Sequence, residues 1–122
     1  KNKYLYNYHR AIQKAQEKSC LFITEGQGDV WKLYEAGVKN AISIFGKSVS
    51  PVQKSILEKS GITKLVVLTD NDQAGREAKM KIQRDMSRMF KVVFPRLSRK
   101  DVGDMSVEDI KTNVLPQLKG MY

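Results

Sequence analysis

Two carboxylates follow directly on an apolar run in the middle of the chain. Residues 65–76 read LVVLTDNDQAGR, so the run ends at Asp70 and Asp72. Side chains two positions apart on an extended backbone point the same way, and two carboxylates that face one point repel each other unless a cation lies between them. A divalent metal is the natural cation, because Mg²⁺ prefers carboxylate and water oxygens. The alternative is that Asp72 or Asn71 only caps the helix that follows.

An earlier apolar run also ends on an acid. Residues 21–24 read LFIT and lead into Glu25, with Gly26 next to it and Asp29 four residues further on. An acid at the end of a buried strand has to be solvated or paired, so Glu25 is a candidate ligand of the same site. Gly26 allows the backbone to turn sharply beside it. Asp29 is either a further metal ligand or a residue that caps the next helix and complements its dipole.

A third group of acids follows the last apolar run, residues 92–94. Asp101 and Asp104 lie in a polar loop, and Lys100 stands beside them as a possible neutralising charge. The alternative for both acids is a solvated loop position or a helix cap. Parallel strands deliver their carboxyl ends to one edge of a sheet, so acids after three separate strands favour a shared site.

The segments that position these acids alternate between helical and extended patterns. Apolar spacing predicts helices over 4–15, 28–36, 51–60 and 73–89, strands over 20–24, 41–45, 64–69 and 92–94, and short helical pieces over 106–118 that Pro116 interrupts. Ser50 and Pro51 open the third helix, while Gly37 and Gly61 close the second and third. Strands that alternate with helices predict a parallel sheet with right-handed crossovers and helices on both faces.

The same spacing assigns faces to two of the helices. The predicted inner positions are Val52, Ile56 and Leu57 on the third helix and Ala74, Ala78, Ile82 and Met89 on the fourth, which carries Lys81, Arg84 and Arg88 on an outward stripe.

Composition limits the class of protein. The 122 residues suffice for one domain, and the formal charge of +9 makes a polyanion, above all nucleic acid, the expected partner. An anionic membrane surface is the competitor, but we find no long apolar stretch and expect a cytoplasmic protein without a membrane partner. One cysteine, Cys20, excludes an internal disulfide and a zinc ribbon, and the one histidine, His9, reads as structural. The chain begins at Lys1 without a methionine, which indicates a domain excised from a longer protein.

The ordered acids resemble the Toprim domain, the acidic catalytic module shared by bacterial-type primases, type IA and type II topoisomerases and several nucleases. Glu25-Gly26 with Asp29 is similar to the family's first glutamate motif, and residues 70–76 resemble its Asp-x-Asp motif in the form that primases favour. Lys100-Asp101 with Asp104 is similar to the primases' third acidic element. The segments over 5–11 and 37–46 also resemble primases.

Two departures from the primase pattern stand out. Gln27-Gly28 replaces an aromatic pair, and Asp101 and Asp104 are one residue further apart than in the usual motif.

The resemblance implies an α/β fold, a Toprim-like four-stranded parallel sheet with helices on both faces. It divides the chain into a preceding helix over 1–19, a catalytic core over 20–105 and a helical tail over 106–122. The implied activity is synthesis of RNA primers on single-stranded DNA from ribonucleoside triphosphates, with a replicative helicase as a further partner. The sequence leaves a chromosomal or a phage source open, and we expect the isolated chain to lack activity.

The resemblance also implies roles for individual residues. Glu25, Asp70 and Asp72 are the implied catalytic residues. The implied ligands of Mg²⁺ or Mn²⁺ are Glu25, Asp70 and Asp72 together with Asp101, Asp104 or Asp29, and the candidate contacts to template or triphosphate are Lys39, Arg76, Arg84 and Lys100.

Other classes of protein fit the residues less well. A Toprim nuclease would use the same acids to hydrolyse phosphodiester bonds and stays open as the alternative. A topoisomerase needs a nucleophilic tyrosine from another domain. A phosphoacceptor receiver domain would be a signalling module with an acidic pocket of unrelated fold, and a dehalogenase-type hydrolase places its Asp-x-Asp motif after the first strand, where this chain has Glu25.

Overall fold

The strands form a four-stranded parallel sheet in the order β2-β1-β3-β4 in the computed structural model, which describes residues 4–119 and 121. The bounds are β1 Cys20–Thr24, β2 Ala41–Ser43, β3 Lys64–Leu68 and β4 Lys91–Val93. Thr24 pairs with both Ser43 and Leu68, so β1, β2 and β3 end at one level. The residues that follow these strands therefore leave the sheet along the same edge, as the sequence predicts.

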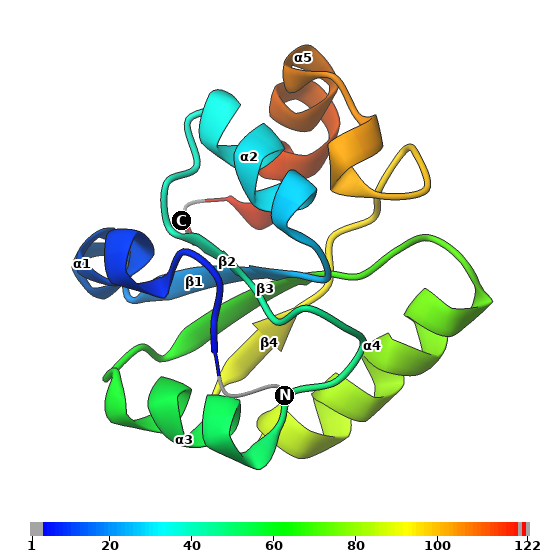
Figure 1. The fold of residues 1–122 in the computed structure, drawn as a ribbon. Helices are drawn as coiled ribbons and strands as arrows, with labels where there is room; N and C mark the ends of the chain where they lie inside the picture. Colours follow the sequence, from blue (N-terminus) through cyan, green and yellow to red (C-terminus); the bar gives the residue numbers. More distant parts are fainter. Residues whose placement is uncertain (1–3, 120, 122) are drawn as a thin grey trace.

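Five α-helices lie among the described residues: α1 Tyr8–Lys18, α2 Gln27–Glu35, α3 Pro51–Lys59, α4 Gln73–Met86 and α5 Val107–Asp109. Figure 1 shows α2 and α5 on one side of the sheet and α3 and α4 on the other. After α5 the chain continues as a π-helical turn, Ile110–Val114, and a 3₁₀ turn, Leu115–Leu118. The predicted α/β fold with helices on both faces of a parallel sheet is confirmed.

Two apolar cores lie on the two faces of the sheet. Alternate residues of β1 enter different cores: Cys20 and Phe22 pack with α2 and the C-terminal turns, whereas Leu21 and Ile23 pack with residues of α1, α3 and α4. A strand buried on both faces must be apolar throughout, which explains the continuous apolar runs of β1 and β3. No helix of the described residues combines the length and the apolar character needed to cross a bilayer.

Local signals at the helix ends act as predicted. The Ser50 side chain accepts a hydrogen bond from the Gln53 amide, and Pro51 is the first residue of α3. Gly37 and Gly61 have positive φ, 91° and 80°, where glycine is favoured.

Several details differ from the predicted pattern. The first helix begins only at Tyr8, since Tyr6 instead forms an antiparallel bridge with Ser43. β2 stops at Ser43, two residues before the predicted end, and Val52 is exposed. The buried position beside Val52 belongs to Gln53, whose side-chain amide donates to the carbonyls of Tyr4 and Ile44.

The inner face of α4 is also shifted. Ala74 is exposed, the helix ends at Met86, and Met89 beyond it is exposed as well. Gly75 and Met86 occupy the inner face with Ala78 and Ile82. The cause is the start of the helix, where Asp72 is the cap and Gly75 lies against the backbone of Asp70.

Candidate active site

Glu25 and Asp70 meet at the carboxyl edge of the sheet. Each follows the end of a central strand, and the Glu25 carboxylate atom Oε2 accepts a hydrogen bond of 2.6 Å from the Asp70 backbone amide. The Glu25 side chain is only 10% exposed and that of Asp70 20%. Strand pairing thus fixes two carboxylates side by side, away from most of the solvent.

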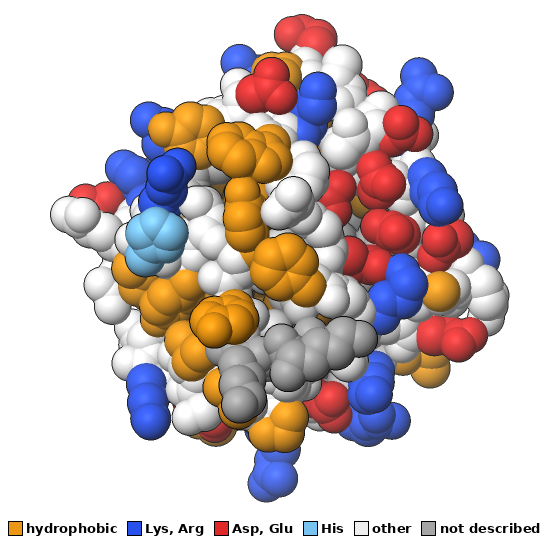
Figure 2. All heavy atoms as spheres, in the orientation of Figure 1, with side chains coloured by type: hydrophobic (Ala, Val, Ile, Leu, Met, Phe, Trp, Pro, Cys, Tyr) orange, Lys and Arg blue, Asp and Glu red, His pale blue; other side chains and the backbone are white. Residues whose placement is uncertain are grey.

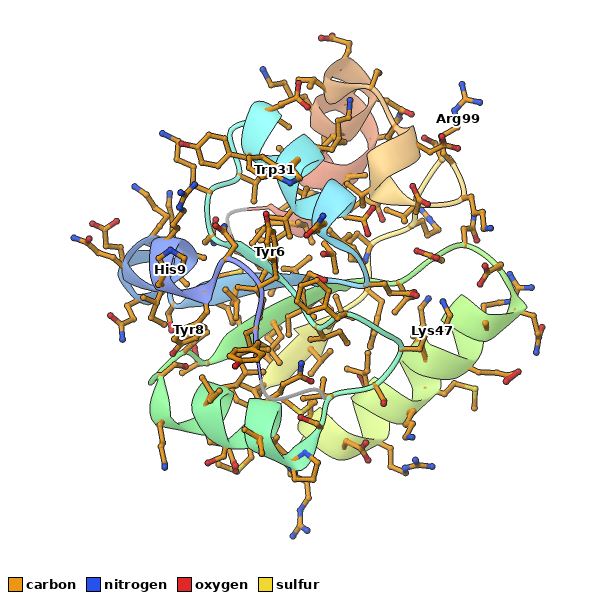
Figure 3. All side chains as sticks on the ribbon, in the orientation of Figure 1. Tyr6, Tyr8, His9, Trp31, Lys47 and Arg99 are labelled. Atoms are coloured by element: carbon orange, nitrogen blue, oxygen red, sulfur yellow. The ribbon has the colours of Figure 1, made fainter. Side chains whose placement is uncertain are left out.

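Lys47 is the cation of this pair, and the sequence analysis did not identify it. Its Nζ atom forms an ion pair with Glu25 Oε1 and lies 3.7 Å from Asp70 Oδ2. The loop from the end of β2 to Lys47 is held against the end of β1, because the hydroxyl of Ser43 and the amide of Gly46 both donate to the Glu25 carbonyl at 3.1 Å. Figure 3 shows Lys47 near the beginning of α4. The one signal in the sequence that could have indicated Lys47 is its position shortly after the end of β2, at the same edge of the sheet as Glu25 and Asp70.

The electrostatics of the site favour a further cation. Burial, followed by the charge of Glu25, raises the pKa of Asp70 to about 6, although Lys47 acts in the opposite direction. Asp29 and Asp101 add smaller contributions that raise the pKa further. Figure 2 shows acidic side chains gathered on one side of the visible face, with basic side chains at the border. Negative charge in the site therefore exceeds what one lysine neutralises.

Asp72 caps α4 and still faces the site. Its Oδ1 atom accepts a hydrogen bond of 2.6 Å from the Gly75 amide, while Oδ2 has no hydrogen-bond partner among the described residues. Its charge acts on Lys47, whose pKa is raised by a hydrogen bond to Glu25 and by the charges of Glu25, Asp70 and Asp72. Capping and a role at the site are compatible, since each uses a different oxygen.

Gly75 allows α4 to begin this close to the acids. A Cβ atom at this position would lie 1.7 Å from the carbonyl oxygen of Asp70. Real Cβ atoms do not approach backbone so closely, so any side chain here would push the helix away from the end of β3.

Asp29 connects two backbone segments. It is 7% exposed, and its two oxygens accept hydrogen bonds from the amides of Gly26 at 3.2 Å and Gly103 at 2.8 Å. Burial raises the pKa of Asp29, while these two hydrogen bonds act in the opposite direction. The contacts hold the beginning of α2 against the loop that contains Asp101.

That loop reaches the site through its backbone. The Asn71 amide donates to the carbonyl of Lys100 at 2.5 Å, and the Asp101 side chain accepts from the Asp104 amide at 2.8 Å as the cap of a 3₁₀ turn, Val102–Asp104. Asp101 lies near Asp29, since a Cβ atom at Gly103 would be 3.1 Å from Asp29 Oδ1 and 3.4 Å from Asp101 Oδ1. The charge of Asp101 contributes to the raised pKa values of Asp29 and Asp70. Asp104 and the side chain of Lys100 are exposed.

A pocket of about 190 Å³ adjoins the acids on the side of β4. Its lining includes Asp70, Arg76, Lys79 and Arg96. Of the four predicted cationic contacts, the structure brings Arg76 to this pocket. Lys79 and Arg96 were missed: Lys79 lies three positions after Arg76 on the same face of α4, a spacing that could have indicated it, whereas Arg96 follows β4 and its approach depends on the fold.

Two of the other predicted cations lie away from this pocket. Lys39 places its Nζ atom 5.6 Å from the ring centre of Tyr34. Arg84 pairs with its neighbour Asp85 and lies eight positions beyond Arg76, about 12 Å further along the helix at 1.5 Å per residue.

The donor set suits Mg²⁺ held partly by substrate. Within residues 4–119 and 121, no three Asp, Glu, His or Cys side chains are grouped as a metal cage. Mg²⁺ rarely requires one, because it keeps several waters and is usually bound through one or two carboxylates and substrate phosphates. Glu25, Asp70 and Asp72 supply carboxylate oxygens at one edge, and the crowding of negative charge there fits a divalent cation.

Comparisons with known proteins agree with this architecture. The family model described as the Toprim domain matches residues 19–94. A DNA primase of Helicobacter pylori is 37% identical over 81 residues, which cover 66% of this chain and 14% of the primase. A DNA primase of Thermotoga maritima is 34% identical over 87 residues, 70% of this chain and 15% of the primase. The chain therefore spans a small part of the length of these relatives.

Solved structures extend the likeness over nearly the whole chain. The crystal structure of the Aquifex aeolicus primase, with zinc-binding and RNA polymerase domains, superposes with a TM-score of 0.74 and 25% identity over 99% of this chain and 29% of that one. A DnaG primase catalytic domain bound to single-stranded DNA gives a TM-score of 0.72 at 21% identity, over 98% of this chain and 38% of that one, a likeness of fold.

Proposed function

The chain belongs to the Toprim domain family and is related to the catalytic cores of bacterial DNA primases, and from this premise we propose that it is the metal-binding catalytic part of a DNA primase. The observation that carries the proposal is the half-buried carboxylate pair of Glu25 and Asp70 beside a cationic pocket. The reaction is nucleotidyl transfer from a ribonucleoside triphosphate to a 3′ hydroxyl on a single-stranded DNA template. Residues 20–105 are proposed as the catalytic core, and the proposed location is the cytoplasm.

The three strand-end acids have distinct tasks in this proposal. Mg²⁺ or Mn²⁺, when bound by Glu25, Asp70 and Asp72, supplies a Lewis acid that neutralises triphosphate charge and lowers the pKa of an attacking hydroxyl. Glu25 and Asp70 hold their oxygens in place through strand pairing, so little reorganisation is needed. Asp72 caps α4 with one oxygen, and its other oxygen has no hydrogen-bond partner among the described residues. Asp101 is available as an additional acid from the loop, whereas Asp29 holds that loop in position.

The pocket beside Asp70 suits the triphosphate. Arg76, Lys79 and Arg96 line it together with Asp70 itself, so cationic side chains and carboxylate share one small cavity. Phosphate oxygens that accept from these cations would bring the triphosphate beside Asp70, where Glu25, Asp70 and Asp72 would hold a metal that neutralises part of its charge. The remaining positive charge of the chain favours the template backbone, and such contacts weaken with salt.

Partners follow from the same proposal. One related structure is a DnaG primase catalytic domain bound to single-stranded DNA, which supports single-stranded DNA as the template here. Ribonucleoside triphosphates are the proposed substrates, and a replicative helicase is the proposed partner in replication. The chain spans 14% of the Helicobacter pylori primase, so the activity is assigned to the complete protein.

The deciding experiment separates polymerisation from hydrolysis. The complete protein is incubated with single-stranded DNA, labelled ribonucleoside triphosphates and Mg²⁺, and in parallel with labelled DNA or RNA without triphosphates. We expect template-dependent RNA products that disappear in Asp70→Asn. Cleavage of the labelled nucleic acid, without RNA synthesis, would assign the same acids to a Toprim nuclease.

A further inference from the structure

We propose that Lys47 is an internal counter-cation of the metal site, which a divalent metal must displace in order to bind. The inference rests on the proposed function, because it takes Glu25 and Asp70 as metal ligands. It adds a residue that sets the metal affinity of the site from within the chain.

The position of Lys47 carries the argument. Its ammonium group contacts Glu25 Oε1 and lies 3.7 Å from Asp70 Oδ2, so it stands between the two carboxylates that a metal would join. A divalent cation that joined these two oxygens would occupy the same space. Two cations so close would also repel each other, so the ammonium group and the metal exclude each other.

The backbone directs Lys47 to this place. The hydroxyl of Ser43 and the amide of Gly46 both donate to the Glu25 carbonyl, which fixes the loop directly before Lys47 against the end of β1. The ion pair therefore costs little backbone ordering beyond what the sheet edge already imposes. A lysine on an unanchored loop would lose more entropy in making the same contact.

The unequal exposure of the three side chains determines which of them can move. The Lys47 side chain is 44% exposed, whereas Glu25 and Asp70 are 10% and 20% exposed and follow the ends of central strands. The lysine can rotate into solvent without disturbing the core, but the carboxylates cannot leave the edge. The exchange of a metal for the ammonium group is thus a movement of Lys47.

A further carboxylate, outside the site, is available to the displaced lysine. A surface hollow beside the first turns of α4 is lined by Lys47, Glu77 and Lys81, among others. Glu77 is exposed and would partly compensate the charge of Lys47 after it leaves Glu25, although Lys81 in the same hollow opposes this move. The displaced state is therefore accessible but less favourable, which keeps metal affinity low until substrate phosphates contribute ligands.

The test measures Mn²⁺ affinity directly. Isothermal titration of Mn²⁺ into metal-free protein compares the unchanged protein with Lys47→Met, which keeps length and apolar volume but removes the charge. Lys111→Met is the matched control, because Lys111 is an exposed lysine of the C-terminal turns and its loss changes net charge equally. The double variant Lys47→Met/Asp70→Asn identifies the site at which the metal binds.

We expect Lys47→Met to bind Mn²⁺ about tenfold more tightly, the effect of one partly screened charge at contact distance. Lys111→Met should match the unchanged protein, and Asp70→Asn should cancel the gain. Metal-free Lys47→Met should also melt at a lower temperature and gain more from added Mn²⁺, because the two acids are then unscreened.

Three results overturn the inference. Equal affinity of the unchanged protein and Lys47→Met, at a site that Asp70→Asn abolishes, rejects the role of Lys47 and leaves the proposed metal site intact. An equal gain of Mn²⁺ affinity in Lys111→Met would mean that the loss of any positive charge has this effect, and not the position of Lys47. Failure of every variant to bind Mn²⁺, Lys47→Met included, means that the carboxylates hold no metal without substrate and overturns the exchange, while the assay of primer synthesis decides the proposed function separately.

Discussion

Asp29 and Asp70 lie at the same edge of the sheet and are stabilised in different ways. Burial raises the pKa of both. Both oxygens of Asp29 accept backbone hydrogen bonds, from Gly26 and Gly103. The Asp70 carboxylate accepts none within the described part of the chain, and its nearest cation is Lys47 at 3.7 Å. A carboxylate satisfied by backbone amides is part of the fold, whereas one that depends on a movable cation can accept a metal.

The largest effect that should distinguish the acids around Asp70 from Asp29 is on catalysis. Asp70→Ala and Asp72→Ala in the complete protein should each lower primer synthesis by at least about a thousandfold, because a metal ligand contributes several kcal/mol to the transition state. Both variants should stay folded: melting of Asp70→Ala should be nearly unchanged, whereas Asp72→Ala should lose about 1 kcal/mol of stability because Asp72 caps α4. The assay pairs RNA synthesis with melting curves.

Asp85→Ala is the control for these two changes. Asp85 is an acid of the same helix, α4, that pairs with Arg84 rather than with the site. Synthesis at the normal rate by Asp70→Ala would remove that residue from catalysis, and loss of the folded state would make the acid structural.

The sequence predicts the site as far as strand ends determine it. β1 Cys20–Thr24 lies where the apolar run predicts it, and β3 ends one residue before the predicted boundary. Glu25 and Asp70 can be assigned to one edge because a parallel sheet requires it. Lys47 and Arg96 could not be assigned, since their approach to Asp70 depends on how two loops cross the edge.

The buried face of α4 and the hydrogen-bond partners of Asp29 could not be predicted from the sequence either. The inner face of α4 depends on where the helix starts, and that is fixed by the contact of Gly75 with the Asp70 carbonyl rather than by apolar spacing. The role of Asp29 was open between cap and ligand, because its partner Gly103 lies 74 positions away. Local patterns cannot reveal such a partner.

A methyl group at Gly75 tests how strongly the Asp70 region depends on the start of α4. Gly75→Ala places Cβ where only 1.7 Å separates it from the Asp70 carbonyl oxygen. We expect the free energy of unfolding to fall by about 3 kcal/mol, the upper range for overpacking that displaces backbone. Urea denaturation measures it, and Ala74→Gly at the exposed neighbouring position serves as control. A loss below that of the control would mean that the helix start adapts without strain.

Asp29→Ala tests the other side of the comparison. The change leaves two partly buried backbone amides without acceptors, so the free energy of unfolding should fall by about 2 kcal/mol. At a pH above neutral, Asp70→Asn should by contrast leave the free energy of unfolding unchanged or raise it. The reason is that it removes a carboxylate whose charged form the fold disfavours. Urea denaturation of both variants at pH 7.5 tests the contrast. Equal losses in the two variants would contradict the distinction between a structural and a functional acid.

The smallest expected effect is the pH dependence that Asp70 gives to stability. The fold raises the pKa of this carboxyl from 3.8 to about 6, so the folded protein holds the proton more tightly than the unfolded chain does. Its contribution therefore favours folding at low pH and is lost as the pH rises from about 4 to about 6. We expect a loss of about 1 kcal/mol, because solvent and Lys47 screen the carboxylate.

The measurement is the difference in free energy of unfolding between the unchanged protein and Asp70→Asn, taken from pH 4 to pH 8 with a chelator present. Asp29, whose pKa is also raised, contributes to both proteins and cancels in the difference. The difference should change from about pH 4 to about pH 6, between the pKa of this carboxyl in the unfolded chain and its pKa in the folded protein. Replacing the chelator with Mg²⁺ should move the upper limit of this change to lower pH, since a cation at Asp70 favours the charged form in the folded protein. A difference that does not vary between pH 4 and pH 7 would mean that the fold does not raise the pKa of Asp70.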